Sequence, residues 1–193
     1  MDVVKLGKIE RMGVLFTFVL GGLLKLSFVW SGGAVWSILF GAVNDSIWEN
    51  LKVFALPYLL WSVFELMMVR ASIRRMVVSK FIGVAAFSAC FIGLSYLCRL
   101  LFGGISAIAL IIVSFVLIGL CHLLSFVLLT GKARLERWFC VSAFCMILFF
   151  VMFLTFTLHP PKSDLFYDGV QSLYGMPGIT QTIAEGNIFA AVR

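Results

Sequence analysis

Five long runs of apolar residues, separated by short polar segments, constrain this chain more than any other feature. Each run has roughly 20 residues, the length that an α-helix needs to cross the hydrocarbon core of a bilayer. Only 12% of the 193 residues are charged, against about 25% in an average soluble domain. The sequence therefore predicts an all-α, polytopic helical bundle in the membrane, with spans at about 12–30, 47–69, 81–102, 105–130 and 138–158.

The bundle and a short tail account for the whole sequence. We expect one bundle over residues 1–158 and an irregular extracytoplasmic tail over residues 159–193, because His159-Pro160-Pro161 stops the last helix. The D-G, Y-G and M-P-G pairs that follow are turn signals. The first run is longer than the 7–15 apolar residues of a signal peptide, so we interpret it as an uncleaved span.

Residues 34–43 form a further apolar segment that is too short to cross a bilayer. We expect it to lie at the interface or to enter the membrane and return, and the two glycines before it allow the turn. Ser46-Ile47-Trp48-Glu49 then matches the S-x-x-E capping box, in which the Ser and Glu side chains satisfy free backbone N–H groups. The second long helix is therefore predicted to begin here, and Pro57 to kink it near Val53.

The basic residues indicate the orientation in the membrane. The amino-terminal segment carries Lys5, Lys8 and Arg11, and the connections after the second and fourth spans carry further clusters. Basic residues concentrate on the cytoplasmic side of membrane proteins. We therefore expect a multi-pass protein of the cell membrane with a cytoplasmic amino terminus and an extracytoplasmic carboxy terminus. The net charge of +6 then reflects this pattern and not a nucleic-acid partner. The further clusters are Arg70, Arg74, Arg75 and Lys80, and Lys132, Arg134 and Arg137.

No metal site, cofactor or catalytic motif is predicted, and the class of enzyme, if any, stays unknown. The sequence has no phosphate loop, nucleotide fingerprint, H-E-x-x-H or Ser-His-Asp order. The cysteines lie in apolar segments without a C-x-x-C pair, so we interpret them as packing residues. They are Cys90, Cys98, Cys121, Cys140 and Cys145.

Residues 41–52 gather polar side chains in an otherwise apolar sequence and form the candidate ligand-binding site. On a helix Asp45, Trp48, Glu49 and Lys52 would share one face through their i, i+3, i+4, i+7 spacing. Two carboxylates, an indole and an ammonium group there suit a polar ligand, an ion or a lipid headgroup. The predicted topology adds outer-side residues, which makes the full set Asn44, Asp45, Trp48, Glu49, Asn50 and Lys52 with Lys25, Arg99, His159, Asp164 and Asp168. Lys162 is also expected on the outer side.

A purely structural interpretation of this stretch remains open. Asp45, Ser46 and Glu49 can cap a helix, Trp48 can lie in the interfacial aromatic belt, and Lys52 can extend to the interface. Capping needs a Ser and a Glu but not Asn44, Asp45 and Asn50, so binding of a ligand stays equally open.

Ionisable residues within spans are costly, so partners are expected for them. Lys25 is expected to reach Asp45 or Glu49, or to extend to the interface. Glu65 and His122 both fall in the inner third of their spans and form a possible intramembrane pair. Such a pair could relay a proton. Alternatively it is a structural hydrogen bond, or Glu65 turns towards Arg70.

Three segments resemble a family of small bacterial multi-pass membrane proteins of unknown function. They are W-S-G-G at 30–33, V-N-D-S-I-W-E-N-L-K at 43–52, and the region from F-T-L-H-P-P to L-Y-G-M near the carboxy end. The family's middle segment typically reads V-N-E-S-x-W-E-H-L-K. Here Asn50 replaces the histidine and Val29 an acidic residue, so a metal site from the family's glutamate and histidine is not expected. The resemblance implies that the polar stretch and the region of Pro160, Pro161 and Asp168 form one feature, and it implies no activity.

Three functions are consistent with these patterns. The first is binding or transport of a small polar molecule or lipid headgroup at an outer-face pocket. The second is a membrane-embedded enzyme acting on lipid, with Asp45 or Glu49 as acid/base and His159 nearby. The third is a scaffold subunit with a membrane protein partner. The bilayer is a partner in all three.

Overall fold

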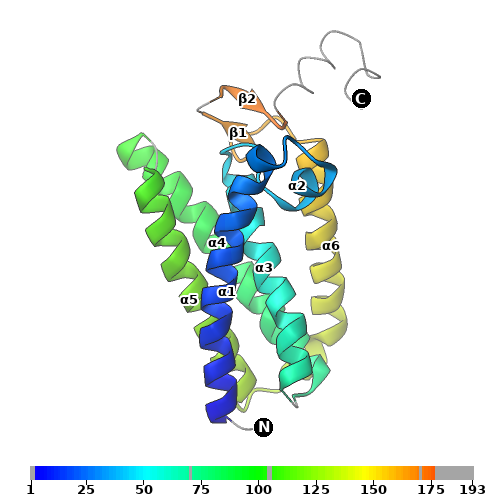
Figure 1. Cartoon of the computed structure of the whole chain (residues 1–193). Coiled ribbons are helices and arrows are strands. Elements are labelled where there is room, and N and C mark those ends of the chain that lie inside the picture. Colours follow the sequence, from blue (N-terminus) through cyan, green and yellow to red (C-terminus); the bar gives the residue numbers. More distant parts are fainter. Residues whose placement is uncertain (1–2, 70, 104–105, 170, 177–193) are drawn as a thin grey trace. The chain divides into compact units, whose positions relative to one another are not determined.

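The computed structural model describes residues 3–69, 71–103, 106–169 and 171–176. Within them the chain forms long helices and one short antiparallel hairpin, in which Tyr167 pairs with Tyr174 (Figure 1). The all-α fold class is confirmed, and five helices are long and apolar enough to cross a membrane. The elements are α1 (Val3–Trp30), α2 (Val35–Phe40), α3 (Ile47–Met68), α4 (Ile73–Phe102), α5 (Ala107–Thr130), η1 (Leu135–Trp138), α6 (Phe139–Leu158), β1 (Tyr167–Asp168) and β2 (Leu173–Tyr174).

Two helices begin well before the apolar runs that predicted them. α1 starts at Val3 and not near residue 12, and α4 starts at Ile73 and not near residue 81. The added turns contain Lys and Arg, which are good helix formers, so charge alone does not end a helix. Glu10 and Lys80, which fall outside the apolar runs, therefore lie on helices.

Glycine, serine and proline set the helix ends. Gly32 and Gly33 follow α1 at φ values of 64° and 80°, which only glycine adopts readily, and so provide the predicted turn. α4 ends at Gly103, whose φ is 72° and whose N–H donates to Arg99 O. The Ser106 hydroxyl accepts from Ala109 N at the start of α5. The described part of the tail contains no helix, and Gly104, Ile105, Arg70 and residues 177–193, on which predictions were also made, lie outside the described residues.

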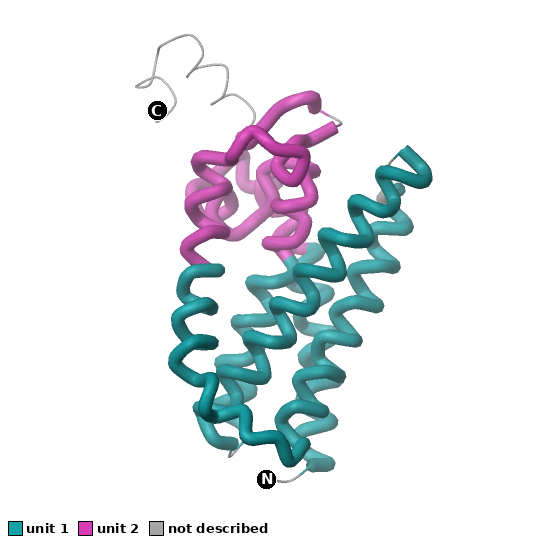
Figure 2. Tube along the Cα trace, turned by 180° about the vertical axis from the view of Figure 1, so that it is seen from behind, with its two compact units in different colours: residues 1–22, 54–149 teal, residues 23–53, 150–193 magenta. Residues whose placement is uncertain are grey.

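The chain divides into two compact units, shown in teal and magenta in Figure 2. Unit 1 comprises residues 1–22 and 54–149, and unit 2 comprises residues 23–53 and 150–193. The buried core of unit 1 takes side chains from α1, α3, α4 and α5, and α4 packs beside α5. Its central members are Leu6, Ile9, Trp61, Val69, Met76 and Leu129.

The start of α1 and the α5–η1 connection lie at the same end of unit 1 (Figure 1), and both segments contain basic residues. Arg75, in the first turn of α4, donates to Leu128 O at 2.9 Å and to Gly131 O at the end of α5. It also lies 3.5 Å from Glu136 Oε1. A cation that satisfies the last carbonyls of a helix stabilises that end.

Large apolar side chains cover the outer surfaces of the helices. In α6, Phe144 and Ile147 are 67% and 66% exposed. In water such continuous apolar exposure would be unfavourable, whereas lipid chains solvate it. Together with the helix lengths, this makes the protein a multi-pass membrane protein.

Candidate functional site

Unit 2 contains the polar stretch, and its first feature is the start of α3. The Ser46 hydroxyl accepts from Glu49 N at 3.3 Å, so the serine half of the predicted capping box is present. The glutamate half is wrong: Asn44 Oδ1, and not Glu49, accepts from Ser46 N, at 2.9 Å. Glu49 Oε2 instead accepts from Val43 N at 3.2 Å. Because α3 begins at Ile47, Asp45 does not share a helical face with Trp48, Glu49 and Lys52 as predicted.

Glu49 and Lys52 form a buried ion pair with Thr157 of α6. Lys52 Nζ lies 2.7 Å from Glu49 Oε2 and 2.7 Å from Thr157 Oγ1, and it also donates to Ile38 O in α2 at 3.3 Å. The Thr157 hydroxyl lies 2.8 Å from Glu49 Oε1. Lys52 is 0% exposed and Glu49 3%. Lys52 therefore does not extend to an interface, and this cluster connects three helices.

Lys25, Asp45 and Asn50 form the accessible part of the same stretch. Lys25 Nζ lies 2.7 Å from Asp45 Oδ1, as the sequence predicted, and it also donates to Asn50 Oδ1. The side chains of Lys25 and Asp45 are 31% and 53% exposed. Asn50 Nδ2 donates to Asp45 O and Ser46 O at 3.2 and 3.0 Å, which holds its carbonyl towards Lys25. An ammonium group and a carboxylate are thus presented side by side at a surface.

The tail folds onto the polar stretch, as the family resemblance implied. Asp168 is fully buried, and its Oδ2 accepts from Asp45 N at 2.8 Å. Asn44 Nδ2 donates to Gly175 O at 2.8 Å, and Trp48 N donates to Leu165 O at 3.1 Å. These bonds connect residues more than 100 positions apart in the sequence.

Trp48 lies in an aromatic cluster and not at a surface. Its ring centroid is 5.0 Å from that of Phe153, 5.5 Å from that of Phe156 and 5.2 Å from that of Phe166. Its side chain is 4% exposed, and no described residue accepts a hydrogen bond from its Nε1. The interpretation of Trp48 as an interfacial aromatic residue is therefore wrong.

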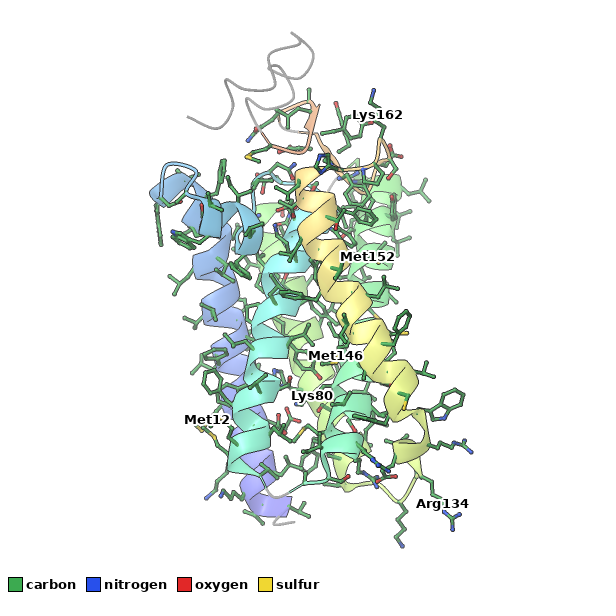
Figure 3. All side chains as sticks on the ribbon, turned by 90° about the vertical axis from the view of Figure 1, so that its right-hand side faces the viewer. Met12, Lys80, Arg134, Met146, Met152 and Lys162 are labelled. Atoms are coloured by element: carbon green, nitrogen blue, oxygen red, sulfur yellow. The ribbon has the colours of Figure 1, made fainter. Side chains whose placement is uncertain are left out.

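Unit 1 contains a second, fully internal group of ionisable side chains. Lys80 Nζ lies 2.9 Å from Glu10 Oε1 and 2.5 Å from Glu65 Oε2. His122 Nδ1 lies 2.6 Å from Glu10 Oε2, and His122 Nε2 lies 3.2 Å from Thr17 Oγ1. Figure 3 shows Lys80 inside the bundle, whereas Arg134 extends away from it. Glu65 and His122 thus belong to one cluster, but Lys80 and Glu10 connect them.

Two glycines make room for this cluster. A Cβ on Gly13 would overlap the His122 ring and Trp61, and one on Gly83 would overlap the Tyr58 hydroxyl. The Tyr58 ring lies edge-on to His122, with centroids 5.0 Å apart, and Lys80 Nζ lies 5.2 Å from the Tyr58 centroid. The backbones of α1 and α4 can therefore approach these large side chains closely.

Four residues of these clusters were not predicted from the sequence: Glu10, Lys80, Thr17 and Thr157. Lys80 was counted with the cytoplasmic basic cluster, although it is 1% exposed and pairs with two carboxylates. One available signal was spacing: Glu10, Gly13 and Thr17 follow i, i+3, i+7 and share a face once the helix is known to begin before them. Thr157 had no comparable signal, because only the fold brings it to Glu49.

Four further outer-side residues were named from the sequence. Arg99 lies in the last turn of α4, in unit 1. His159, Lys162 and Asp164 lie on the exposed connection after α6 in unit 2. No group of three His, Cys, Asp or Glu side chains in the described parts of the chain is arranged to hold a metal ion.

Comparison with known proteins identifies a family but no activity. No curated protein and no solved structure is a significant match to the sequence. The model of one family does match, over residues 2–176, and this range includes the polar stretch, the intramembrane cluster and the hairpin. The chain therefore belongs to DUF6512, a family of unknown function.

Proposed function

We propose that this membrane protein binds a small polar molecule or a lipid headgroup at Lys25, Asp45 and Asn50. The observation that carries the proposal is the partly exposed Lys25–Asp45 pair, in which Nζ and Oδ1 are 2.7 Å apart. A ligand with an anionic and a cationic group, such as a zwitterionic headgroup, could pair with both. Exposed ion pairs contribute only about 0–1 kcal/mol to stability, so opening this pair for a ligand costs little.

The surrounding residues would position this pair without touching the ligand. Asp168 accepts a hydrogen bond from Asp45 N, and Asn44 accepts one from Ser46 N. Asn44 also donates to Gly175 O, so the backbone around Asp45 is held in place. The buried Glu49–Lys52 pair fixes the next turn. Binding sites with supported side chains lose less conformational entropy on binding. Participation of Arg99, His159 and Asp164 stays a prediction.

We also propose that this site faces the outside of the cell membrane. The basic residues Lys5, Lys8 and Arg11 begin α1, Arg74 and Arg75 begin α4, and three more lie between α5 and α6. The positive-inside rule assigns these segments to the cytoplasm. An odd number of spans then puts Lys162 and the hairpin outside.

A scaffold function is the second candidate, and a specific observation favours it. Asn44, Asp45, Glu49, Asn50 and Lys52 all have partners within the protein. Such a network can simply attach the tail to the bundle. A lipid-modifying enzyme has less support, because both carboxylate oxygens of Glu49 are occupied by Lys52, Val43 N and Thr157.

Native mass spectrometry of the protein released from lipid nanodiscs separates the first two functions. We expect a bound polar molecule or lipid on the wild type, lost from Lys25→Gln and from Asp45→Asn. Lys162→Gln is the matched control, because Lys162 is also an exposed lysine of unit 2, and it should retain the ligand. Retention by both site variants would overturn the proposal, and a wild type without any ligand would favour the scaffold.

A further inference from the structure

The cluster in unit 1 gathers four ionisable side chains from four different helices in a nearly dry interior. Glu10 comes from α1, Glu65 from α3, Lys80 from α4 and His122 from α5. Their exposed fractions are 4%, 0%, 1% and 1%. A charged group within a membrane-spanning bundle costs at least about 2.5–3.5 kcal/mol. Four ionisable side chains in contact are therefore expected either to neutralise one another's charges completely or to serve a function.

The charges of the cluster cancel only if it holds one proton more than two carboxylates, one ammonium group and a neutral imidazole. Two carboxylates and one ammonium group leave a net charge of −1 when His122 is neutral. The net charge is zero only if a proton occupies His122 or one of the two carboxyl groups. Because an uncompensated buried charge costs several kcal/mol, this proton has a strongly favourable site to occupy.

The contacts connect the possible positions of that proton. A proton on His122 Nδ1 can pass across 2.6 Å to Glu10 Oε2, and the imidazolium and the carboxylate both become neutral. Lys80 can donate a proton to Glu65 Oε2 at 2.5 Å and accept one from Glu10 Oε1 at 2.9 Å. Each step moves one proton and leaves the net charge of the cluster unchanged. Only exchange with the surroundings changes it.

Other titratable groups around the cluster are Tyr58 of α3 and Cys121 of α5, which interact electrostatically with Glu10. His122 Nε2 contacts Thr17 Oγ1. Beside this contact is a narrow gap, which is lined by Thr17, Tyr58, Cys121 and three apolar residues. The gap is too small to hold a water molecule. The structure thus closes the cluster on this side, and proton exchange there requires a movement of the helices.

The two carboxyl groups of the cluster also interact with each other. Glu65 forms side-chain hydrogen bonds with both Lys80 and Glu10. A hydrogen bond between two carboxyl groups requires that one of them holds a proton, because two carboxylates in contact repel each other. Both this contact and the unbalanced charges argue against an ion pair with a fixed set of protons.

We propose that Glu10, Glu65, Lys80 and His122 form an intramembrane centre that binds and releases a single proton. The centre is independent of the Lys25–Asp45 site, since it involves different residues and a different ligand. Through this centre, unit 1 can couple a conformational change to protonation.

Infrared difference spectroscopy of the protein in nanodiscs, between about pH 5 and pH 9, tests this proposal. Bands of a buried carboxyl group or an imidazole are expected to change between these two pH values. Labelling with ¹⁵N-histidine or ¹³C-glutamate assigns them in the wild type. His159 is the second of the two histidines, and His159→Asn leaves His122 as the single labelled one. The change should be lost in Glu10→Gln and in Glu65→Gln, because each removes the surplus negative charge. His122→Asn should remove the imidazole bands and leave the change of a buried carboxyl group.

Glu136→Gln is the matched control, because Glu136 is a glutamate of unit 1 outside the cluster and 39% exposed. It should keep the cluster's bands, while removing any band of Glu136 itself. A labelled wild type in which neither His122 nor a buried glutamate changes protonation would overturn the proposal, and this result does not depend on any variant folding. Bands that persist unchanged in all three cluster variants would overturn it equally.

Discussion

The ammonium group of Lys52 is fully buried, and it contacts a carboxylate, a hydroxyl group and a backbone carbonyl. It lies 2.7 Å from Glu49 Oε2 and 2.7 Å from Thr157 Oγ1. Replacing such a pair by apolar groups is often neutral, whereas removing one partner leaves a buried charge unpaired. The stability of unit 2 should therefore depend on the pair as a whole more than on either residue.

Lys52→Met should destabilise the protein strongly, because it leaves the Glu49 carboxylate buried without a cation. We expect a loss of about 3–5 kcal/mol in the free energy of unfolding, measured by denaturant titration in detergent micelles. Adding Glu49→Gln should restore much of this loss. Lys162→Met, at an exposed site, should stay within about 0.5 kcal/mol of the wild type. A double variant as unstable as the sum of both single variants would contradict this coupling.

For single residues, the sequence predicted which side chains make polar contacts better than it predicted the partners of these contacts. Lys25 was expected to reach Asp45 or Glu49, or to extend to the interface, and it pairs with Asp45. Lys52, in contrast, has its partner Thr157 on a helix 105 residues away, and no local pattern encodes that contact. Glu10 and Lys80 were overlooked because charge was treated as the end of a span.

The hairpin β1–β2 and the start of α3 are joined by side chains of both elements. Asp168 carries much of this junction, since Oδ2 accepts from Asp45 N at 2.8 Å and Oδ1 from Gln171 N at 3.2 Å. Hydrogen bonds to charged groups contribute about 1.5–3 kcal/mol each. A two-stranded hairpin is at best marginally stable alone, so this one depends on its attachment.

Asp168→Ala should release the hairpin from the polar stretch while the long helices remain folded. Amide hydrogen exchange at Tyr167–Asp168 and Leu173–Tyr174 should accelerate roughly tenfold or more, which corresponds to a local loss of about 1.4 kcal/mol or more. Lys162→Ala, in the exposed connection before the hairpin, should leave the exchange unchanged. If protection in the hairpin survived Asp168→Ala, the junction would have to depend on Asn44 and the aromatic cluster instead.

Element types were predictable from the sequence, and element ends less so. Apolar runs longer than about 17 residues have few alternatives to a spanning helix. Ser46 correctly marked the start of α3. The two prolines after α6 correctly marked the end of α6. The starts of α1 and α4 were placed too late, because helices continue into basic segments. The hairpin was not predicted, since strands of two residues leave no pattern.

The proposed topology of the whole molecule has five membrane crossings, with the polar stretch and the tail outside. The number of long apolar helices follows from local composition, so the sequence predicted it. The assignment of sides depends on the distribution of Lys and Arg. α6 provides the simplest test, because a single helix, Phe139–Leu158, separates the basic connection after α5 from the tail.

The most direct test is cysteine labelling of intact cells with a membrane-impermeant maleimide, in a variant whose five native cysteines are replaced by alanine. Lys162→Cys should react in intact cells, and Arg134→Cys only after the cells are permeabilised. Reaction of both positions from the same side would contradict a membrane crossing by α6 and with it the five-span chain. The opposite pattern, with only Arg134→Cys accessible in intact cells, would contradict the proposed orientation and place the Lys25–Asp45 site in the cytoplasm.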